Sequence, residues 1–463
     1  MEGLIMAGQL ILGLSILVTL HEFGHFITAK WFKMRVEKFY LFFDFLFPIP
    51  SLLNFALFKK KIGDTEYGLG WFPLGGYVSI AGMIDETQDA ATLAKDPEPW
   101  EFRAKPAWQR LIVMLGGVIV NVITGVVIFI SLTYSNGNNY ISKEELNKNG
   151  IVALDLGKHI GLKTGDKIIK VNGADYKQLS DLRSSDVLLG DNSYYTVLRD
   201  GKEVNIQIPA NFIGQLSDKK SAFIEPMTKF KVLDVTAPNP PSLLDKWLGK
   251  GSDEMLPALS AGLKAGDYIT AVNQTPINFY HEIREVLSKE AGKPIRLAIL
   301  RNGKADTLDM VVAKSGQIGF QADILMKMSH EDYSFGQSVG IGSKRAFSVI
   351  TDNVRGFKKI ATGDVSASKA LSGPIGIAQM FGGVWDWTRF WMLTGLLSMA
   401  LAFFNVLPIP ALDGGHAIFL IYEIITGKPA SDKVMERAQQ IGMILLLGLM
   451  AYTFGNDIFK SFF

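Results

Sequence analysis

The stretch "LVTLHEFGHFITAKW" (residues 17–31) places ionisable side chains near the end of a long apolar segment. His21, Glu22 and His25 follow a run without charges over residues 3–20. Side chains four residues apart lie on one face of a helix, so both imidazoles can reach one metal ion, with the glutamate beside them. Ionisable groups inside a membrane helix are costly and usually functional. The H-E-x-x-H spacing therefore predicts a zinc site with Glu22 as its general base.

The overall composition excludes several classes of protein. The chain has 463 residues, of which 48% are hydrophobic and 20% are charged, so it is neither disordered nor wholly embedded in a membrane. A net charge of +2 gives no basis for nucleic-acid binding. The absence of cysteine excludes thiol nucleophiles, thiolate ligands for zinc and disulfides.

Four apolar segments are long enough to cross a bilayer, which takes about 20 residues. They span residues 3–28, 111–134, 390–412 and 438–456. The first lacks the basic start and small-residue cleavage site of a signal peptide, so we expect it to stay in the membrane. Lysine and arginine follow segment one, precede segment two and lie between segments three and four, which predicts cytoplasmic connections there. Both termini and residues 135–385 are then expected on the opposite side.

That outer stretch contains an internal repeat. "GLKTGDKIIKVNGADY" (161–176) aligns with "GLKAGDYITAVNQTPI" (262–277), and eight of the sixteen positions are identical. "LRDGK" and "LRNGK" follow at a similar spacing, and Asp-Gly or Asn-Gly between apolar runs favours a tight hairpin turn. The repeat therefore predicts two small, strand-rich domains over about 136–226 and 227–316.

Residues 335–363 have apolar side chains at helical spacing, with lysine and arginine over much of the remaining surface. This pattern is typical of an amphipathic helix that lies on lipid headgroups, and it fits equally well a helix packed against the outer domains.

Two imidazoles leave a catalytic zinc short of one protein ligand. Three further histidines, His159, His281 and His330, belong to the outer stretch, on the wrong side of the membrane. The remaining candidates, Asp413 and His416, share the motif "NVLPIPALDGGH". An apolar-flanked carboxylate without a nearby cation favours Asp413 as the ligand, whereas His416 could ligate instead or hydrogen-bond to the carboxylate.

Six features occur in order over nearly the whole chain: "HEFGH", "FPLGGYVSIAGM", "GGVIVN", the tandem repeat, "LSGPIGIA" and "NVLPIPALDGGH". This set resembles the site-2 protease family of intramembrane zinc metalloproteases, in particular the bacterial regulator-of-sigma-E proteases with tandem PDZ domains. The resemblance implies a multi-domain membrane protein: a four-helix transmembrane metalloprotease core with a re-entrant β-hairpin within 67–83, plus two β-rich PDZ domains. The implied domains are 1–135 (segments one and two), 136–226 and 227–316 (PDZ domains), 317–385 (amphipathic linker) and 386–463 (segments three and four).

The resemblance also implies roles for single residues. His21, His25 and Asp413 match the three zinc ligands, and Glu22 matches the catalytic base. Asn405 matches an asparagine that holds the extended backbone of the substrate. A GxxxN-type motif of the family ends at Asn121 and runs through Gly117 of this chain. The acidic stretch 84–108 is longer than expected for the family.

The implied function is that of a zinc-dependent endopeptidase that cuts transmembrane segments of single-pass membrane proteins in regulated intramembrane proteolysis. Substrates would be a pre-trimmed anti-sigma factor or remnant signal peptides, with the PDZ pair as a filter against bulky outer domains. The implied location is a bacterial inner (cytoplasmic) membrane, with the termini and PDZ domains in the periplasm. One alternative is a membrane-anchored PDZ scaffold or sensor whose metal site is structural or inactive. A serine or aspartyl intramembrane protease has weaker support, because no paired membrane aspartates are visible.

Overall fold

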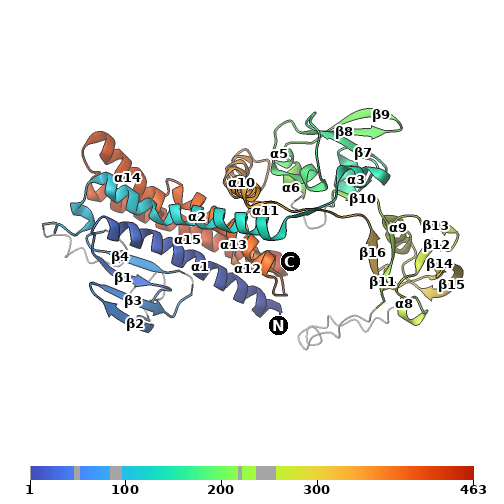
Figure 1. Cartoon of the computed structure of the whole chain (residues 1–463), viewed down its shortest axis with the longest axis horizontal. Coiled ribbons are helices and arrows are strands. Elements are labelled where there is room, and N and C mark those ends of the chain that lie inside the picture. The colour runs from blue at the N-terminus through green and yellow to red at the C-terminus, as the bar shows by residue number, and fades with distance from the viewer. Residues whose placement is uncertain are drawn as a thin grey trace. The chain divides into compact units, whose positions relative to one another are not determined.

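The computed structural model describes residues 2–45, 53–73, 75–83, 96–216, 222–235 and 257–462. The chain divides into two compact units (Figure 1). The first combines Met1–Asn138 with Glu331–Phe463, and the second is Asn139–His330. The first part of the acidic stretch noted above, residues 84–95, lies outside the described residues.

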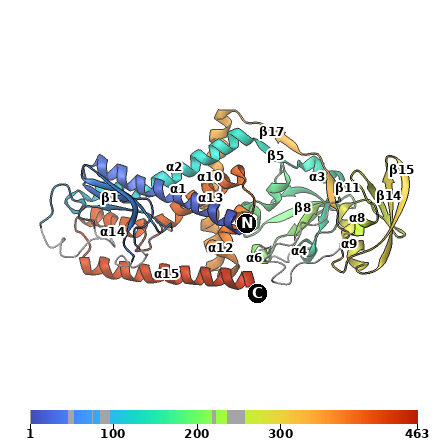
Figure 2. The same cartoon turned by 90° about the horizontal axis from the view of Figure 1, so that it is seen from below.

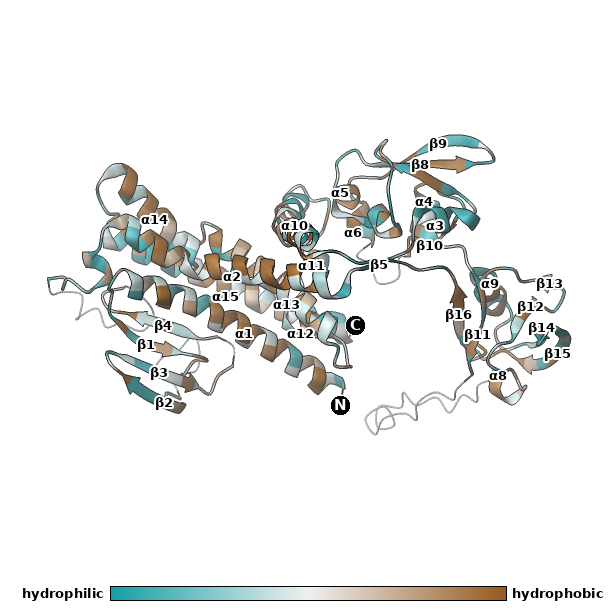
Figure 3. Ribbon diagram, viewed as in Figure 1, coloured by the Kyte–Doolittle hydropathy of each residue, from teal (hydrophilic) through white to brown (hydrophobic). Residues whose placement is uncertain are grey.

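All four predicted membrane segments are helices in the first unit, each long and apolar enough to span a bilayer. Hydrophobic residues dominate the ribbons of the first two (Figure 3). The helices are α1 (Glu2–Trp31), α2 (Ala107–Asn136), α13 (Trp387–Val406) and α15 (Asp432–Phe462). The backbones of helices α1 and α2 are in direct contact at Gly24 and Gly116. A Cβ atom on Gly116 would lie only 2.5 Å from the carbonyl oxygen of Gly24, so a larger residue would not fit there. Small residues permit this close approach between membrane helices.

The third membrane helix ends earlier than the apolar run in the sequence. Helix α13 stops at Val406, because Pro408 and Pro410 lack the backbone N–H that a continuing helix requires. A separate helix, α14 (Asp413–Thr426), then begins at Asp413. Asp413, which directly follows the apolar run of residues 390–412, therefore lies in the first turn of a new helix and not at the end of α13.

A four-stranded sheet lies beside the C-terminal half of α1 in both views (Figures 1 and 2). Its strands are β1 (Val36–Tyr40), β2 (Ala56–Ile62), β3 (Thr65–Gly70) and β4 (Tyr77–Ile80), in the order β2-β3-β1-β4. Strand β1 is parallel to β3 and antiparallel to β4. The turn between β2 and β3 contains Gly63, whose φ is positive.

The expected hairpin over residues 67–83 is therefore wrong in its pairing. This stretch supplies β3 and β4, but the two strands do not pair with each other, because β1 lies between them. The true hairpin is β2–β3, and β4 is left at one edge of the sheet. The strand that separates them, β1, follows α1 in the sequence and lies outside residues 67–83.

Helix α10 (Phe335–Ala361) is the predicted amphipathic helix, and it begins with a capping box formed by Ser334 and Gln337. Apart from Lys359 near its C-terminal end, its buried residues are small and spaced four residues apart, Ser338, Gly342 and Ala346, and the bulky apolar residues are not among them. The face with these small residues packs on α2 and α13. The sequence indicated neither of these helices as a partner, and small residues favour such close contact between helices.

The smaller helices of the first unit complete the bundle. They are η2 (Phe102–Ala104), α11 (Ala367–Ala370) and α12 (Pro374–Phe381). Asp457 of α15 accepts hydrogen bonds from the backbone N–H groups of Gly373 and Gly376, at the start of α12. Arg110 of α2 forms an ion pair with Glu423 of α14, which holds α14 against α2.

The second unit has two hydrophobic cores, one within residues 146–224 and one within residues 230–318. The first core is surrounded by β5 (Asn138–Tyr140), α3 (Lys143–Asn149), β6 (Ile151–Ala153), α4 (Asp155–His159), β7 (Lys167–Val171), η3 (Leu179–Arg183), α5 (Ser185–Leu188), β8 (Tyr194–Arg199), β9 (Lys202–Gln207), α6 (Phe212–Leu216) and β10 (Ile224–Pro226). Around the second lie β11 (Lys229–Asp234), α8 (Pro257–Ser260), β12 (Tyr268–Val272), β13 (Thr275–Pro276), α9 (Tyr280–Lys289), β14 (Pro294–Arg301), β15 (Lys304–Val311) and β16 (Gln321–Leu325). The remaining strand, β17 (Ser329–Glu331), pairs with β5.

The two predicted hairpin turns are confirmed in this unit. Asp200 and Gly201 join β8 to β9, and Asn302 and Gly303 join β14 to β15, all with positive φ. A two-residue turn with two positive φ angles matches the twist of the paired strands, which explains the Asp-Gly and Asn-Gly sequences. The sheets that contain these hairpins have the orders β7-β8-β9 and β13-β12-β14-β15.

Candidate metal centre

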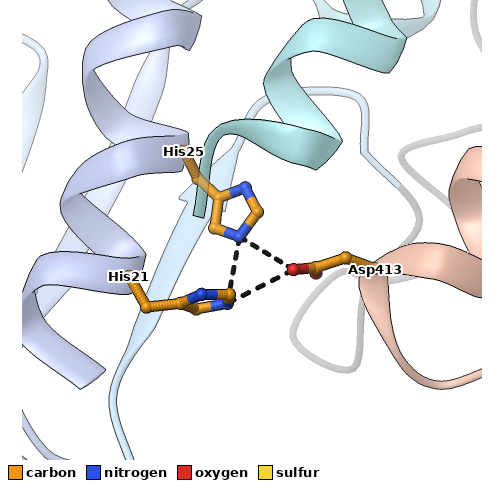
Figure 4. A group of neighbouring side chains, drawn as sticks. All are labelled: His21, His25 and Asp413. Carbon is orange, nitrogen blue, oxygen red and sulfur yellow. Dashed lines mark hydrogen bonds and ion pairs between the residues drawn. The ribbon is translucent and has the colours of Figure 1, made fainter. Parts of the chain in front are cut away.

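Helix α1 positions the two imidazoles of the H-E-x-x-H motif. His21 and His25 lie one turn apart on the same face, with their rings nearly perpendicular and their Nε2 atoms 3.3 Å apart (Figure 4). The arrangement follows directly from the i, i+4 spacing in a helix.

The third side chain at this point comes from the opposite end of the sequence. The Oδ2 atom of Asp413, in the first turn of α14, lies 3.3 Å from Nε2 of His21 and 3.5 Å from Nε2 of His25 (Figure 4). Within the part of the chain that the structure describes, these three residues form the group whose potential ligand atoms converge. His416, the alternative considered from the sequence, does not belong to this group.

The three atoms suit a zinc ion. Ligand atoms bound tetrahedrally to zinc at about 2.0–2.1 Å lie roughly 3.3–3.4 Å from one another. The triangle of two imidazole nitrogens and a carboxylate oxygen has nearly these edges. In addition, the buried Oδ2 atom of Asp413 has no hydrogen-bond partner among the described residues. Because a buried carboxylate oxygen without a partner is costly, the geometry favours a cation at this point.

Helix α2 contacts both rings on the side of their Nδ1 atoms, away from the point where the Nε2 atoms meet. The Nδ1 atom of His25 lies 2.8 Å from the carbonyl oxygen of Val113, and Nδ1 of His21 lies 3.2 Å from the side-chain amide of Asn121. A Cβ atom on Gly117 would lie 2.5 Å from Cε1 of His21 and 2.6 Å from Nε2 of His25. Because Gly117 has no side chain, the two rings can occupy the space beside it. Sequence reasoning missed Val113, because a backbone carbonyl has no signature in the side-chain pattern.

A cavity of ≈ 230 Å³ opens beside this centre. Its lining includes the three converging side chains, Glu22 and the edge strand β4. Asn405 of α13 also reaches the centre, with its Nδ2 atom 3.4 Å from Nε2 of His21. The structure thus brings every site residue expected from the sequence to one place.

The apolar wall of the cavity was not expected from the sequence. It consists of Phe43, Phe45, Tyr77, Val78, Ile80, Met83 and Met114. The hydroxyl of Tyr77 donates a hydrogen bond to Oδ1 of Asp44, at 3.0 Å, and its ring stacks on that of Tyr40. Burial and the Asp44 carboxylate raise the pKa of Tyr77 above its ordinary value, so the hydroxyl stays protonated as a donor.

Comparison with known proteins identifies the family. Residues 9–449 match the family described as Peptidase family M50. The chain belongs to this family. It is 28% identical to a candidate zinc metalloprotease of Neisseria meningitidis, with 97% of each chain covered. It is also 27% identical to a regulator of sigma E protease of Haemophilus influenzae (98% of each chain) and 28% identical to one of Salmonella typhi (96% of this chain and 97% of the relative).

Membership of family M50, the site-2 proteases, makes this protein a zinc metalloendopeptidase. The four apolar helices make it a membrane protein. Zinc is the cofactor that the two-histidine, one-carboxylate group of this M50 peptidase suits.

Proposed function

We propose that His21, His25 and Asp413 hold the zinc ion, and that this M50 peptidase cuts the transmembrane segments of single-pass membrane proteins. The observation that carries the proposal is the convergence of the three ligand atoms on a membrane helix, next to an edge strand. A peptide bond that reaches this centre from the bilayer would meet ligands, base and strand together.

Glu22 acts as the base in this proposal. When bound, zinc supplies a Lewis acid that polarises the peptide carbonyl and acidifies water. Glu22 lines the same cavity and takes a proton from the attacking water. The oxygen of that water bonds to the carbonyl carbon, the C–N bond breaks, and Glu22 returns the proton to the leaving amine.

Strand β4 and Asn405 position the substrate. A helical segment shields its peptide bonds with its own hydrogen bonds, so the substrate must unwind before it is cut. The unwound segment adds beside the edge strand β4 as a further strand, and the amide of Asn405 holds its backbone. We further propose that the β2–β3 hairpin is re-entrant, since Leu57, Phe58 and Ile62 on β2 are all more than half exposed.

The second unit acts as a filter. We assign its two cores to PDZ domains over 136–226 and 227–316, connected through 317–385 to the helices of 386–463. The termini and these domains face the periplasm, and the connections rich in lysine and arginine face the cytoplasm. The domains exclude membrane proteins with bulky outer portions, so that an anti-sigma factor is cut only after trimming. Remnant signal peptides need no trimming.

A cleavage assay with Glu22→Gln tests the proposed chemistry. The test substrate is a single-pass protein with a helix-weak transmembrane segment and a short outer tail. We expect wild type to cut it, and Glu22→Gln to retain zinc but lose activity by roughly 10²–10⁴-fold, because the proton transfer is lost. Full activity of Glu22→Gln in the cellular pathway would instead favour a scaffold with an inactive metal site.

Deletion of residues 136–316 tests the filter separately. We expect the shortened protein to bind zinc, to cut the short substrate as before, and to cut a substrate with a folded outer domain that wild type rejects. Slower cutting of the short substrate, without a gain on the long one, would show that the domains recruit substrates instead.

A further inference from the structure

Asn121 is a buried polar residue that the chemistry described above does not use. It lies on α2 and is 0% exposed. Its Nδ2 atom is 3.2 Å from Nδ1 of His21, while its Oδ1 atom is buried without a hydrogen-bond partner in the described residues. The hydroxyl of Ser398 on α13 donates to its backbone carbonyl at 2.7 Å, which anchors this turn of α2.

The orientation of this amide decides which nitrogen of His21 carries the proton. A neutral imidazole has one N–H and one lone pair. If Nδ2 of Asn121 donates to Nδ1, the proton of the ring sits on Nε2, the atom that faces Asp413, and a protonated nitrogen cannot bind a metal. A half-turn of the amide brings Oδ1 to the same place, where it accepts a hydrogen bond from Nδ1–H and leaves the Nε2 lone pair free.

The neighbouring imidazole shows which of the two arrangements serves the site. Nδ1 of His25 lies 2.8 Å from the carbonyl oxygen of Val113, which can only accept a hydrogen bond. His25 therefore carries its proton on Nδ1 and presents the Nε2 lone pair. Both rings present Nε2 to the same point. His21 therefore also needs a hydrogen-bond acceptor at Nδ1, as His25 has in the Val113 carbonyl, so that its proton stays on Nδ1.

We propose that Asn121 is a positioning residue whose Oδ1 atom accepts a hydrogen bond from Nδ1–H of His21 and so keeps its Nε2 atom available as a metal ligand. This inference rests on the proposed zinc site. Hydrogen-bond acceptors behind histidine ligands commonly change metal affinity by about 10–100-fold when they are removed. The buried amide, held between α1 and α13, has this role here.

Two substitutions separate an acceptor from a donor at this position. Asn121→Asp keeps an acceptor of the same size and removes the donor, whereas Asn121→Leu removes both. Zinc affinity is measured on the full-length purified protein by competition with a chelator of known strength, and the absorption spectrum of the Co²⁺-loaded protein reports the ligand geometry. Thr133→Val, which removes another buried polar group from α2, is the matched control.

We expect Asn121→Leu to weaken zinc binding by about 10–100-fold and to change the Co²⁺ spectrum. Asn121→Asp should stay within a few-fold of wild type with the wild-type spectrum, and Thr133→Val should change neither. If Asn121→Leu does not fold, Asn121→Ala removes the same oxygen with a smaller side chain. Equal damage from Asn121→Asp and Asn121→Leu would overturn the inference, because it would make the amide a donor. Wild-type affinity in Asn121→Leu would also overturn it.

The proposed zinc site is tested separately by His25→Ala. Loss of zinc in His25→Ala together with unchanged binding in Asn121→Leu would refute the role of Asn121 alone. Full zinc binding in His25→Ala would refute the site itself.

Discussion

Asp267 in the second unit and Asp413 in the first unit differ in how their carboxylate oxygens are satisfied. In the second unit, the Asp267 side chain is 1% exposed, and both of its oxygens accept hydrogen bonds from the guanidinium of Arg301, at 2.8 and 2.7 Å. The backbone N–H of Lys264 donates a further one at 2.9 Å. In the first unit, Oδ2 of Asp413 faces two imidazoles and has no hydrogen-bond partner in the described chain.

The second unit repeats the arrangement of Asp267 at Asp166. Asp166 accepts two hydrogen bonds from Arg199 and one from the backbone of Lys163, and each arginine also donates to a glycine carbonyl, that of Gly161 or Gly262. A buried carboxylate whose hydrogen bonds are complete stabilises its domain, whereas one with an open oxygen is available to a ligand. This difference distinguishes Asp413, the proposed metal ligand, from Asp166 and Asp267.

The strongest test of this comparison is removal of the open carboxylate. Asp413→Ala should lower the zinc content of the purified protein from about one per chain to near zero, because two imidazoles alone hold zinc weakly. Metal analysis measures it, with His416→Ala as the control three residues away on the same helix. Zinc retained in Asp413→Ala and lost in His416→Ala would reverse the assignment.

A smaller loss of zinc affinity is expected from a substitution that crowds the site without removing a ligand. In Gly117→Ala, the new methyl group would meet both imidazoles at 2.5–2.6 Å, so the rings must shift and zinc affinity should fall by about 10–100-fold. Gly125→Ala is the matched control on the same helix, because its methyl group meets the flexible end of Met399 at 2.5 Å. Equal zinc affinity in the two variants would show that Gly117 does not shape the site.

Removal of a carboxylate whose hydrogen bonds are complete should lower the stability of its domain and leave zinc binding unchanged. Asp267→Ala leaves Arg301 without its main partner and should destabilise the second core by about 2–4 kcal/mol, with zinc content unchanged. Hydrogen exchange of residues 257–320 in the full-length protein measures the loss. Asp309→Ala is the control: its side chain is 73% exposed in an ion pair with Arg296, and such exposed pairs contribute little to stability. Loss of zinc in Asp267→Ala would contradict the distinction between Asp413 and Asp267.

The last and smallest effect is on pH dependence. Burial, the largest single influence, raises the pKa of Asp267, but the hydrogen bonds from Arg301 and the backbone of Lys264, together with the two positive charges, outweigh it and hold the pKa of the carboxyl below its ordinary value of 3.8. The stabilisation from this ion pair is therefore present above pH 3.8 and is lost as the pH falls through the lower pKa of the folded state. We expect the difference in hydrogen-exchange protection between wild type and Asp267→Ala to shrink as the pH falls from about 4 to about 3. A difference that is constant over this range would show that charge does not contribute.

The sequence by itself determined the features that depend on local periodicity. Runs of about 20 apolar residues identified all four long helices, because a bilayer sets that length. The four-residue spacing of His21 and His25 placed both rings on one face, and Asp-Gly and Asn-Gly marked the hairpin turns. The family and its zinc chemistry also follow from motifs that can be read along the chain.

Tertiary structure decided whatever joins distant segments. Spacing alone left Asp413 and His416 both open as the third ligand, and only the break at Pro408 and Pro410 with the restart of the helix brings the carboxylate to the imidazoles. Strand β1 pairs with both β3 and β4 and lies between them, so these two strands do not form the expected local hairpin. The small-residue face of α10, the Val113 carbonyl and the Asn121 amide acquire their roles through contacts with other helices. Helix and strand periods are properties of neighbouring residues, whereas these contacts depend on how whole elements pack, which no local pattern encodes.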